Sequence, residues 1–320
     1  MIGRGKIWLY AGISENLKLV VDYGFYSVDT ELMSISLTEN VLSADNQQGT
    51  PIKSGTPQRL NAKYPSEKEI TNKEAILLGI LYTDGCLSKK SKNCWRFYVS
   101  NTSYEIIQTF KDCMINLFKL EPNRVRISQK LVNGRPFYKA VVDSGLYGSL
   151  LTSRYGTFRT LAFKKEDGRK IYPPAKLPFD RHTNLNLISR FLRAAFSCDG
   201  GVNLYIGRSK QGYKFLIRNV YLACNHPQLQ TDYHRLLKLL SIKSKIIVRD
   251  RKILVQGKNN LDKFRKKISF LNGVKITQHS AYWQGWEKNK VLNLALASYG
   301  RANSIFNLSK FKDNDIVRSS

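Results

Sequence analysis

Residues 77–85 read L-L-G-I-L-Y-T-D-G, and residues 192–200 read L-R-A-A-F-S-C-D-G. Each stretch is an apolar run with a small residue at its third position, a small or modest residue four positions later, and Asp-Gly at its end. Residues four apart share one face of an α-helix, and small side chains there let a second helix approach closely. The repeat therefore predicts two helices packed side by side, each ending in a carboxylate.

The close contact would involve the small residues of both runs, which are Gly79, Thr83, Ala194 and Cys198. It would bring Asp84 and Asp199 together, and two such carboxylates cannot both stay ionised without a counter-charge. Oxygen ligands suit Mg²⁺, so the pair predicts a magnesium site. For one copy alone, an ordinary Asp-Gly helix stop is the stronger interpretation. Two copies in matching contexts favour the paired site.

The net charge of +28 lies entirely after residue 70. Residues 1–70 carry a net charge of −1, residues 71–180 carry +10, and residues 181–320 carry +19. A basic region of this size with interleaved aromatic residues favours a nucleic-acid partner over an anionic membrane or a merely basic surface.

The chain divides into three parts. Residues 1–70 form an N-terminal extension and linker to which the sequence assigns no role. Residues 71–180 open on the capping box Thr71–Glu74, followed by a helix that we expect to stop at Gly85 with a positive φ. A strand (95–101), a helix (104–118), a hairpin (124–131 and 136–143) and a helical stretch (146–155) follow, and Asn133-Gly134 supplies the hairpin turn.

Residues 181–320 repeat this order and end in a C-terminal tail, after a proline-containing linker at 171–183. The predicted elements are a helix (185–198), strands (202–207 and 215–224), a helix (228–240), a hairpin (243–248 and 253–256) and a helix (261–268). The period is near 115 residues, which indicates a duplicated domain.

These paired motifs resemble those of LAGLIDADG homing endonucleases in the single-chain, two-repeat form. The motif's small residue falls on Gly79 and Ala194, and its acid falls on Asp84 and Asp199. The resemblance covers about residues 71–285, and the second motif departs from the pattern at residues 193, 197 and 198. It implies an α+β fold of two pseudo-symmetric αββαββα repeats, whose four-stranded antiparallel sheets form a saddle for duplex DNA.

The resemblance also implies a catalytic centre. Asp84 and Asp199 would share two or three divalent ions, taken as Mg²⁺, and each DNA strand would be cut by a metal-activated water. Asn101 and Asn225, at the ends of equivalent strands, would help to place the water, although each is equally well explained as a strand-end cap. Lys275 would be the active-site lysine of the second repeat, and Lys164 or Lys165 that of the first.

Strand alternation supports a basic sheet face in each repeat. In the first, Arg124, Arg126, Ser128 and Lys130 lie two apart, with Val125 and Ile127 directed at helices. In the second, Lys243, Lys245, Arg249 and Arg251 follow the same pattern, with Ile246 and Val248 on the apolar side. These residues are DNA-binding candidates, together with Arg96 and Arg218. Arginine and lysine can contact guanine edges and phosphates.

The sequence thus predicts a site-specific double-strand DNA endonuclease that acts as a monomer without an obligate protein partner. Because Met1 opens the chain without a Cys or Ser at an intein-type N-terminus, we expect it to be intron-encoded. One alternative is an RNA maturase that binds its own intron on the same fold. Another is a DNA-binding regulator, which the two retained acids disfavour.

Other classes are not supported. The five cysteines and four histidines match no zinc spacing, and no phosphate loop or Ser-His-Asp order is present. No apolar run reaches membrane-spanning length, and the N-terminus lacks a secretory pattern. We therefore expect an intracellular, reducing location, either the cytoplasm or nucleoid or an organelle matrix, and no membrane partner. Trp95, Trp283 and Trp286 are expected in the core.

Overall fold

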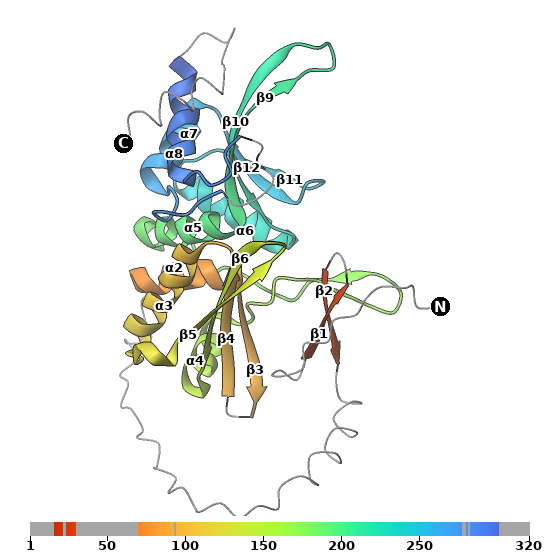
Figure 1. The fold of residues 1–320 in the computed structure, drawn as a ribbon, viewed down its shortest axis with the longest axis vertical. Helices are drawn as coiled ribbons and strands as arrows, with labels where there is room; N and C mark the ends of the chain where they lie inside the picture. The colour runs from red at the N-terminus through yellow and green to blue at the C-terminus, as the bar shows by residue number, and fades with distance from the viewer. Residues whose placement is uncertain are drawn as a thin grey trace, which may run out of the picture.

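The computed structural model describes residues 16–21, 24–29, 70–92, 94–276, 280 and 282–300. Two units with the same order of elements follow one another (Figure 1). The first comprises α2 (Asn72–Leu81), β3 (Gly85–Ser91), β4 (Cys94–Asn101), α3 (Tyr104–Phe118), β5 (Arg126–Val132), β6 (Arg135–Asp143) and α4 (Gly145–Tyr155). The second comprises α5 (Leu185–Asp199), β9 (Gly200–Arg208), β10 (Lys214–Ala223), α6 (Pro227–Leu239), β11 (Ser244–Ile247), β12 (Lys252–Gln256) and α7 (Lys258–Lys267).

Each unit is an αββαββα repeat built on one antiparallel four-stranded sheet, which confirms the α+β fold class. The strand orders are β3-β4-β6-β5 and β9-β10-β12-β11, which are equivalent element by element. The sequence analysis missed β3, which begins at Gly85, the last residue of the first motif. In the view of Figure 1 most helices lie to the left of the sheets, and the buried core fills the space between the two layers.

Helices α2 and α5 pack against each other at the junction of the two repeats. A Cβ added at Gly79 would lie 2.5 Å from the Phe191 carbonyl oxygen and 2.7 Å from Ala194 Cβ. No side chain larger than hydrogen fits there without a shift of the α5 backbone. The small residues of the two motifs therefore set the distance between the helices, as their spacing predicted.

The capping box of α2 is present, because Thr71 Oγ1 accepts from Glu74 N and Glu74 Oε2 accepts from Thr71 N. The expected positive φ at Gly85 is wrong, since this residue enters β3 instead. Glycine is still required, because a Cβ at Gly85 would lie 2.6 Å from Leu81 Cα. The predicted hairpin turn is confirmed, with φ of 50° at Asn133 and 73° at Gly134.

Further elements lie outside the two repeats. Strands β1 (Asn16–Val21) and β2 (Gly24–Asp29) pair with each other, and β7 (Phe163–Lys164) pairs with β8 (Lys170–Ile171). Helix α8 (Lys288–Ala297) follows the second repeat and packs on α7, β9 and β10; it was not predicted. The rest of the N-terminal extension and the tail after residue 300 lie outside the described residues. None of the described helices is long and apolar enough to cross a bilayer.

The irregular segment between the repeats is held by side chains of both repeats, which hydrogen-bond to its main-chain carbonyls. Tyr82 Oη donates to the Lys176 carbonyl oxygen at 2.9 Å, and the His226 ring lies 2.6 Å from the Pro173 carbonyl oxygen. Two tryptophans are placed as expected in or against the core: Trp283 is 2% exposed, and Trp286 packs on it. Trp95 is half-buried and packs on α4, where Gly148 makes room for it.

Candidate active site

The carboxylates of Asp84 and Asp199 open into one pocket of about 300 Å³ at the ends of the two motif helices. Asp84 lies between the end of α2 and the start of β3, and Asp199 is the last residue of α5. Residues of both repeats line the pocket: Asp84, Ser100, Asn101, Thr102, Ser103, Ile106 and Phe137 from the first, and Ser197, Cys198, Asp199, Val274, Lys275 and Lys288 from the second half. The α2–α5 contact therefore brings together two acids that are far apart in the sequence.

Both acids are surrounded by protein atoms, although each keeps some access to solvent through the pocket. Burial, and then repulsion from Asp84, raises the pKa of Asp199 well above its usual range. Burial also raises the pKa of Asp84, and hydrogen bonds from Asn101 and Cys198 oppose that shift. Such a pair needs positive charge to be ionised together.

Asn101 holds the first acid directly. Its Nδ2 donates to Asp84 Oδ2 at 2.6 Å, while its Oδ1 accepts from Ser103 N at the start of α3. The residue is therefore the expected strand-end cap and also a hydrogen-bond partner of the acid, while its role in placing a water stays a prediction.

The proposed equivalence of Asn225 with Asn101 is wrong by one position. Strand pairing aligns Gly85 with Val99 and Gly200 with Leu222, so the counterpart of Asn101 is Cys224. Asn225 is exposed and does not line the pocket. A slip of one residue turns a strand side chain to the opposite face, which explains the error.

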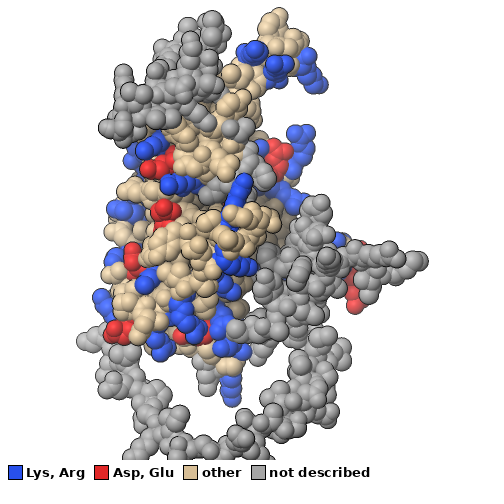
Figure 2. Space-filling view, viewed as in Figure 1, with Lys and Arg blue, Asp and Glu red and all other residues tan. Residues whose placement is uncertain are grey.

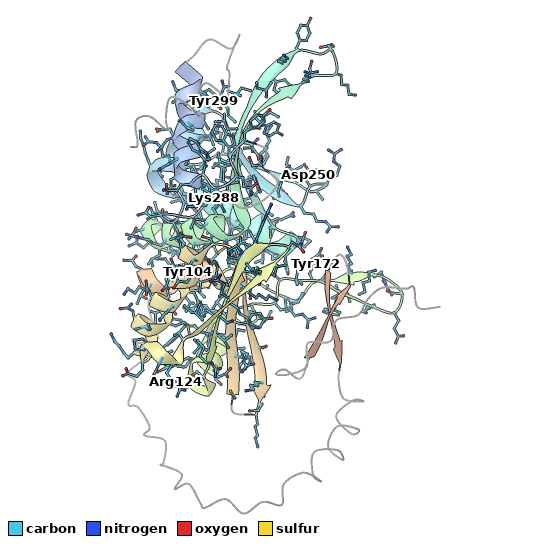
Figure 3. The ribbon with its side chains drawn as sticks, in the orientation of Figure 1. Tyr104, Arg124, Tyr172, Asp250, Lys288 and Tyr299 are labelled. Atoms are coloured by element: carbon cyan, nitrogen blue, oxygen red, sulfur yellow. The ribbon has the colours of Figure 1, made fainter. Side chains whose placement is uncertain are left out.

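Lys288 is the charged group that the sequence analysis missed. It is 7% exposed, and its Nζ donates to the carbonyl oxygens of Ser197 at 2.7 Å and Gly200 at 2.6 Å, on either side of Asp199. Figure 3 shows it at the level of α5. Burial lowers the pKa of Lys288 to about 8, against the attraction of Cys198, Asp84 and Asp199. The signal was present, because Lys288 falls on the buried stripe of α8 with Val291, Leu292 and Ala295.

The predicted lysines differ in whether they line the pocket. Lys275 is exposed and lines the pocket, so it remains a candidate. Lys164 and Lys165 lie on and beside β7, exposed and outside the pocket lining. Neither therefore supplies the lysine expected from the first repeat.

On the first sheet, Arg96, Arg126, Ser128 and Lys130 share the solvent-facing side, opposite Phe97, Val99 and Ala140. Arg96 is held there by Asp143, which accepts from its Nε and Nη2 at 2.7 Å each. Arg126 also donates to Asp143, at 2.9 Å, but keeps a side chain that is 63% exposed. Arg124 does not belong to the strand: it ends the 3-10 turn Pro122–Arg124, at the lower end of the first repeat (Figure 3).

Two expectations for the second sheet are wrong. Arg218 lies on the helix-covered side, where it donates to the side chain of Ser298 at 2.7 Å and stacks on Tyr299. The predicted alternation of basic and apolar residues does not continue beyond Lys245, because β11 ends at Ile247. Val248 is therefore 75% exposed, and Arg249 and Arg251 lie in the turn. Lys243 is exposed just before the strand.

The donor set fits magnesium. No group of three or more His, Cys, Asp and Glu side chains suited to a metal occurs among the residues that the structure describes. Mg²⁺ commonly binds through one or two carboxylates and completes its shell with water and substrate phosphates. The two acids are oxygen donors, mutually repelling and open to the pocket, so they match that mode and not a closed zinc site.

The second repeat matches a known family model. Residues 186–269, which span most of α5 through α7, match the family model described as a LAGLIDADG-like domain. None of the curated proteins matches the chain.

Three solved structures are among those similar to it. Mesophilic variants of the homing endonuclease I-DmoI are 16% identical over 63% of this chain and 99% of theirs, with a TM-score of 0.40. I-LtrWI bound to target DNA is 10% identical over 72% and 92%, with a TM-score of 0.44. I-AabMI bound to uncleaved DNA is 12% identical over 70% and 89%, with a TM-score of 0.42. On its family-model match and its paired motif helices, the chain carries a LAGLIDADG-like domain at residues 186–269, joined to a first repeat with the same order of elements.

Proposed function

We propose that this chain is a site-specific, Mg²⁺-dependent endonuclease that cuts both strands of a DNA duplex and acts as a monomer. The pocket carries the proposal, because acids from equivalent positions of the two repeats line the same cavity. An approximate twofold arrangement of acids suits a duplex, whose two strands are themselves related by twofold symmetry. The LAGLIDADG-like domain and the charge of +28 support the same substrate class.

The chain's own residues have distinct roles in this proposal. Asp84 and Asp199 would hold the divalent ions, which when bound polarise a phosphate and activate water. Asn101 fixes one oxygen of Asp84, and Lys288 fixes the backbone on both sides of Asp199. Lys275 at the rim would contact the phosphate backbone. The exposed sheet faces would bind the flanking duplex through residues such as Arg126, Ser128 and Lys130.

We further propose that the DNA target is the chain's host gene without its intron. A maturase on the same fold would bind intron RNA and would not need the acids. Because both acids are retained and enclosed in a polar pocket, nuclease activity is the better-supported function.

The test is to incubate the purified full chain and Mg²⁺ with a plasmid that carries the intron-less host locus. We expect one double-strand break at a fixed position, no cleavage in excess chelator, and binding without cleavage when Ca²⁺ replaces Mg²⁺. Asp84→Asn and Asp199→Asn are the matched inactive variants. Cleavage by either variant at the normal rate would contradict the proposed metal-binding role of the two acids. Binding to the intron RNA without binding to the duplex would favour the maturase.

A further inference from the structure

The β9–β10 hairpin is much longer than its counterpart in the first repeat. The β9–β10 hairpin runs from Gly200 to its partner Leu222, and the β3–β4 hairpin runs from Gly85 to its partner Val99. The β9–β10 hairpin is therefore longer by eight residues. The β9–β10 ribbon has nine residue pairs against six in β3–β4, and the three extra pairs extend it by about 10 Å at ~3.3 Å per residue. Figure 1 shows its outer end projecting alone beyond the rest of the second repeat. We call residues 205–217 the arm.

The arm is exposed on both faces and carries large apolar side chains. Tyr205 is 41% exposed, Phe215 is 49% exposed and Tyr213 is 72% exposed. An isolated two-stranded ribbon is only marginally stable in water, and exposed apolar clusters of this kind mark contact surfaces. The tip is nevertheless ordered by hydrogen bonds, including Ser209 N to the Tyr213 carbonyl oxygen at 2.8 Å.

The positive charge of the arm indicates the kind of partner that it binds. Arg208, Lys210 and Lys214 lie at its outer end, and no acid occurs between Gly200 and Thr231. Lys and Arg side chains gather at this end in Figure 2, at the top of the view. A polyanion therefore complements the positive charge of the arm. A nucleic acid has an anionic backbone and also exposes apolar groups between its phosphates, so it matches both the basic and the apolar side chains of the arm.

The dimensions of the arm fit duplex DNA. The major groove of B-DNA admits a two-stranded β-ribbon, and it presents thymine methyl groups to apolar side chains. Tyr205 and Phe215 lie on the same side of the ribbon as Ile217, because Tyr205 pairs with Ile217 and Phe215 with Gly207. This is also the side of Asn203 and Asn219, on the solvent-facing surface of the second sheet.

We propose that the arm lies in the major groove beyond the central site and lengthens the DNA contact on the second-repeat side. The inference rests on the proposed DNA-binding function. At ~3.4 Å per base pair, the extra length of about 10 Å corresponds to about three base pairs. The protected half-site facing the second repeat is therefore longer than the half-site facing the first, and the lysines and arginine at the tip bind phosphates.

The test is hydroxyl-radical footprinting of the full chain on its cleavage site, with Ca²⁺ in place of Mg²⁺. We expect protection to extend about three base pairs further from the cleavage centre on one side. In a shortened variant, an Asn-Gly turn replaces residues 206–216 and connects Tyr205 to its paired residue Ile217. This variant should lose that extra protection and still cleave at the same position.

A triple variant separates charge from length. Arg208→Ala, Lys210→Ala and Lys214→Ala together should flatten the dependence of log affinity on log salt concentration by roughly 0.9 for each phosphate that the arm no longer neutralises. The matched control replaces three lysines on or at the ends of helices, Lys73, Lys119 and Lys238, and should change the slope less.

Three outcomes would overturn the proposal. The footprint could be equally long on both sides, it could be unchanged in the shortened variant, or shortening could abolish a dimer and so assign the arm to contact between copies. Sedimentation of both proteins tests the last. Absence of any DNA binding by the wild-type chain would instead overturn the proposed function itself.

Discussion

The amide of Asn101 donates to the Asp84 carboxylate at 2.6 Å, whereas the residue in register with it in the second repeat is Cys224. The two acids are therefore supported differently. Asp84 is held by a neutral amide, and the backbone around Asp199 is held by the Lys288 ammonium. Burial raises the pKa of the Cys224 thiol to about 12, so this residue is an uncharged neighbour. The two halves of an approximately symmetric site thus have unequal chemistry.

This inequality predicts the effect of removing the amide. Asn101→Ala should lower the cleavage rate by about 10- to 100-fold, which is typical when a residue that orients a metal-binding carboxylate is removed. DNA binding in Ca²⁺ should change little. Asn225→Ala is the matched control and should cleave normally, because Asn225 is exposed and outside the pocket. Equal losses in both variants would contradict the assigned register.

The two lysines near the acids should give different results. Lys288→Met should weaken Mg²⁺ binding, lower the melting temperature and slow cleavage, because it leaves the carbonyls on both sides of Asp199 without their donor. Lys275→Met should slow cleavage without changing the melting temperature, because Lys275 is exposed at the rim. Mg²⁺ titrations of cleavage and thermal denaturation measure both effects. Identical behaviour of the two variants would argue against the role of Lys288.

The acid pair should make the metal-free protein less stable as the pH rises. A carboxyl whose pKa is raised in the folded state does not affect stability while it is protonated in both the folded and the unfolded states. Above about pH 4 the same carboxyl ionises in the unfolded state, and it then opposes folding. The Asp199→Asn variant should therefore become more stable relative to wild type as the pH rises, when thermal denaturation is followed in chelator. Saturating Mg²⁺ should reduce this difference.

Asp143 provides a control of opposite sign. Its hydrogen bond from Arg96 lowers its pKa, so its contribution to stability is present at neutral pH and is lost as the pH falls through the folded value. Asp143→Asn should therefore be least stable relative to wild type at neutral pH. If Asp199→Asn and Asp143→Asn showed the same pH trend, the electrostatic account of the site would be wrong.

The helix contact predicts a steric limit at Gly79. Gly79→Ala should cost about 1–3 kcal/mol of unfolding free energy, since its Cβ would meet the Phe191 carbonyl oxygen at 2.5 Å. Gly79→Leu should cost more and should also reduce cleavage, because it separates the helices that bring the two acids together. Lys73→Ala on the exposed side of the same helix serves as the control, and chemical denaturation gives the values. A stable, fully active Gly79→Leu variant would refute close packing.

Two arginines should separate binding from stability. Arg126→Ala should weaken DNA binding with little change in melting temperature, because this side chain is exposed on the sheet face. Arg218→Ala should lower the melting temperature, because it removes the hydrogen bonds to Ser298 and the stacking on Tyr299. Affinity measured against salt concentration, together with thermal denaturation, distinguishes the two. The reverse result would place Arg218 on the DNA-binding face after all.

Features that depend on neighbouring residues were predictable from the sequence. The capping box of α2, the Asn133-Gly134 turn and the bounds of α3 follow from local propensities. The paired motifs predicted the helix contact because small residues four apart identify the close-packed face. Asp84 and Asp199 were found in this way, since a repeated pattern carries its functional residue to the same place in both copies.

The tertiary structure decided which side chains surround those acids. The spacing of the apolar residues of α8 places Lys288 on its buried stripe, but only the packing of α8 on the second repeat brings it to the backbone around Asp199. Cys224 rather than Asn225 is the counterpart of Asn101 because strand register is set by pairing between distant segments, and one position reverses the face. Arg218 is removed from the solvent-facing sheet surface for the same reason. The sequence by itself thus determined the two acids and the helices that present them, while long-range packing determined their charge environment.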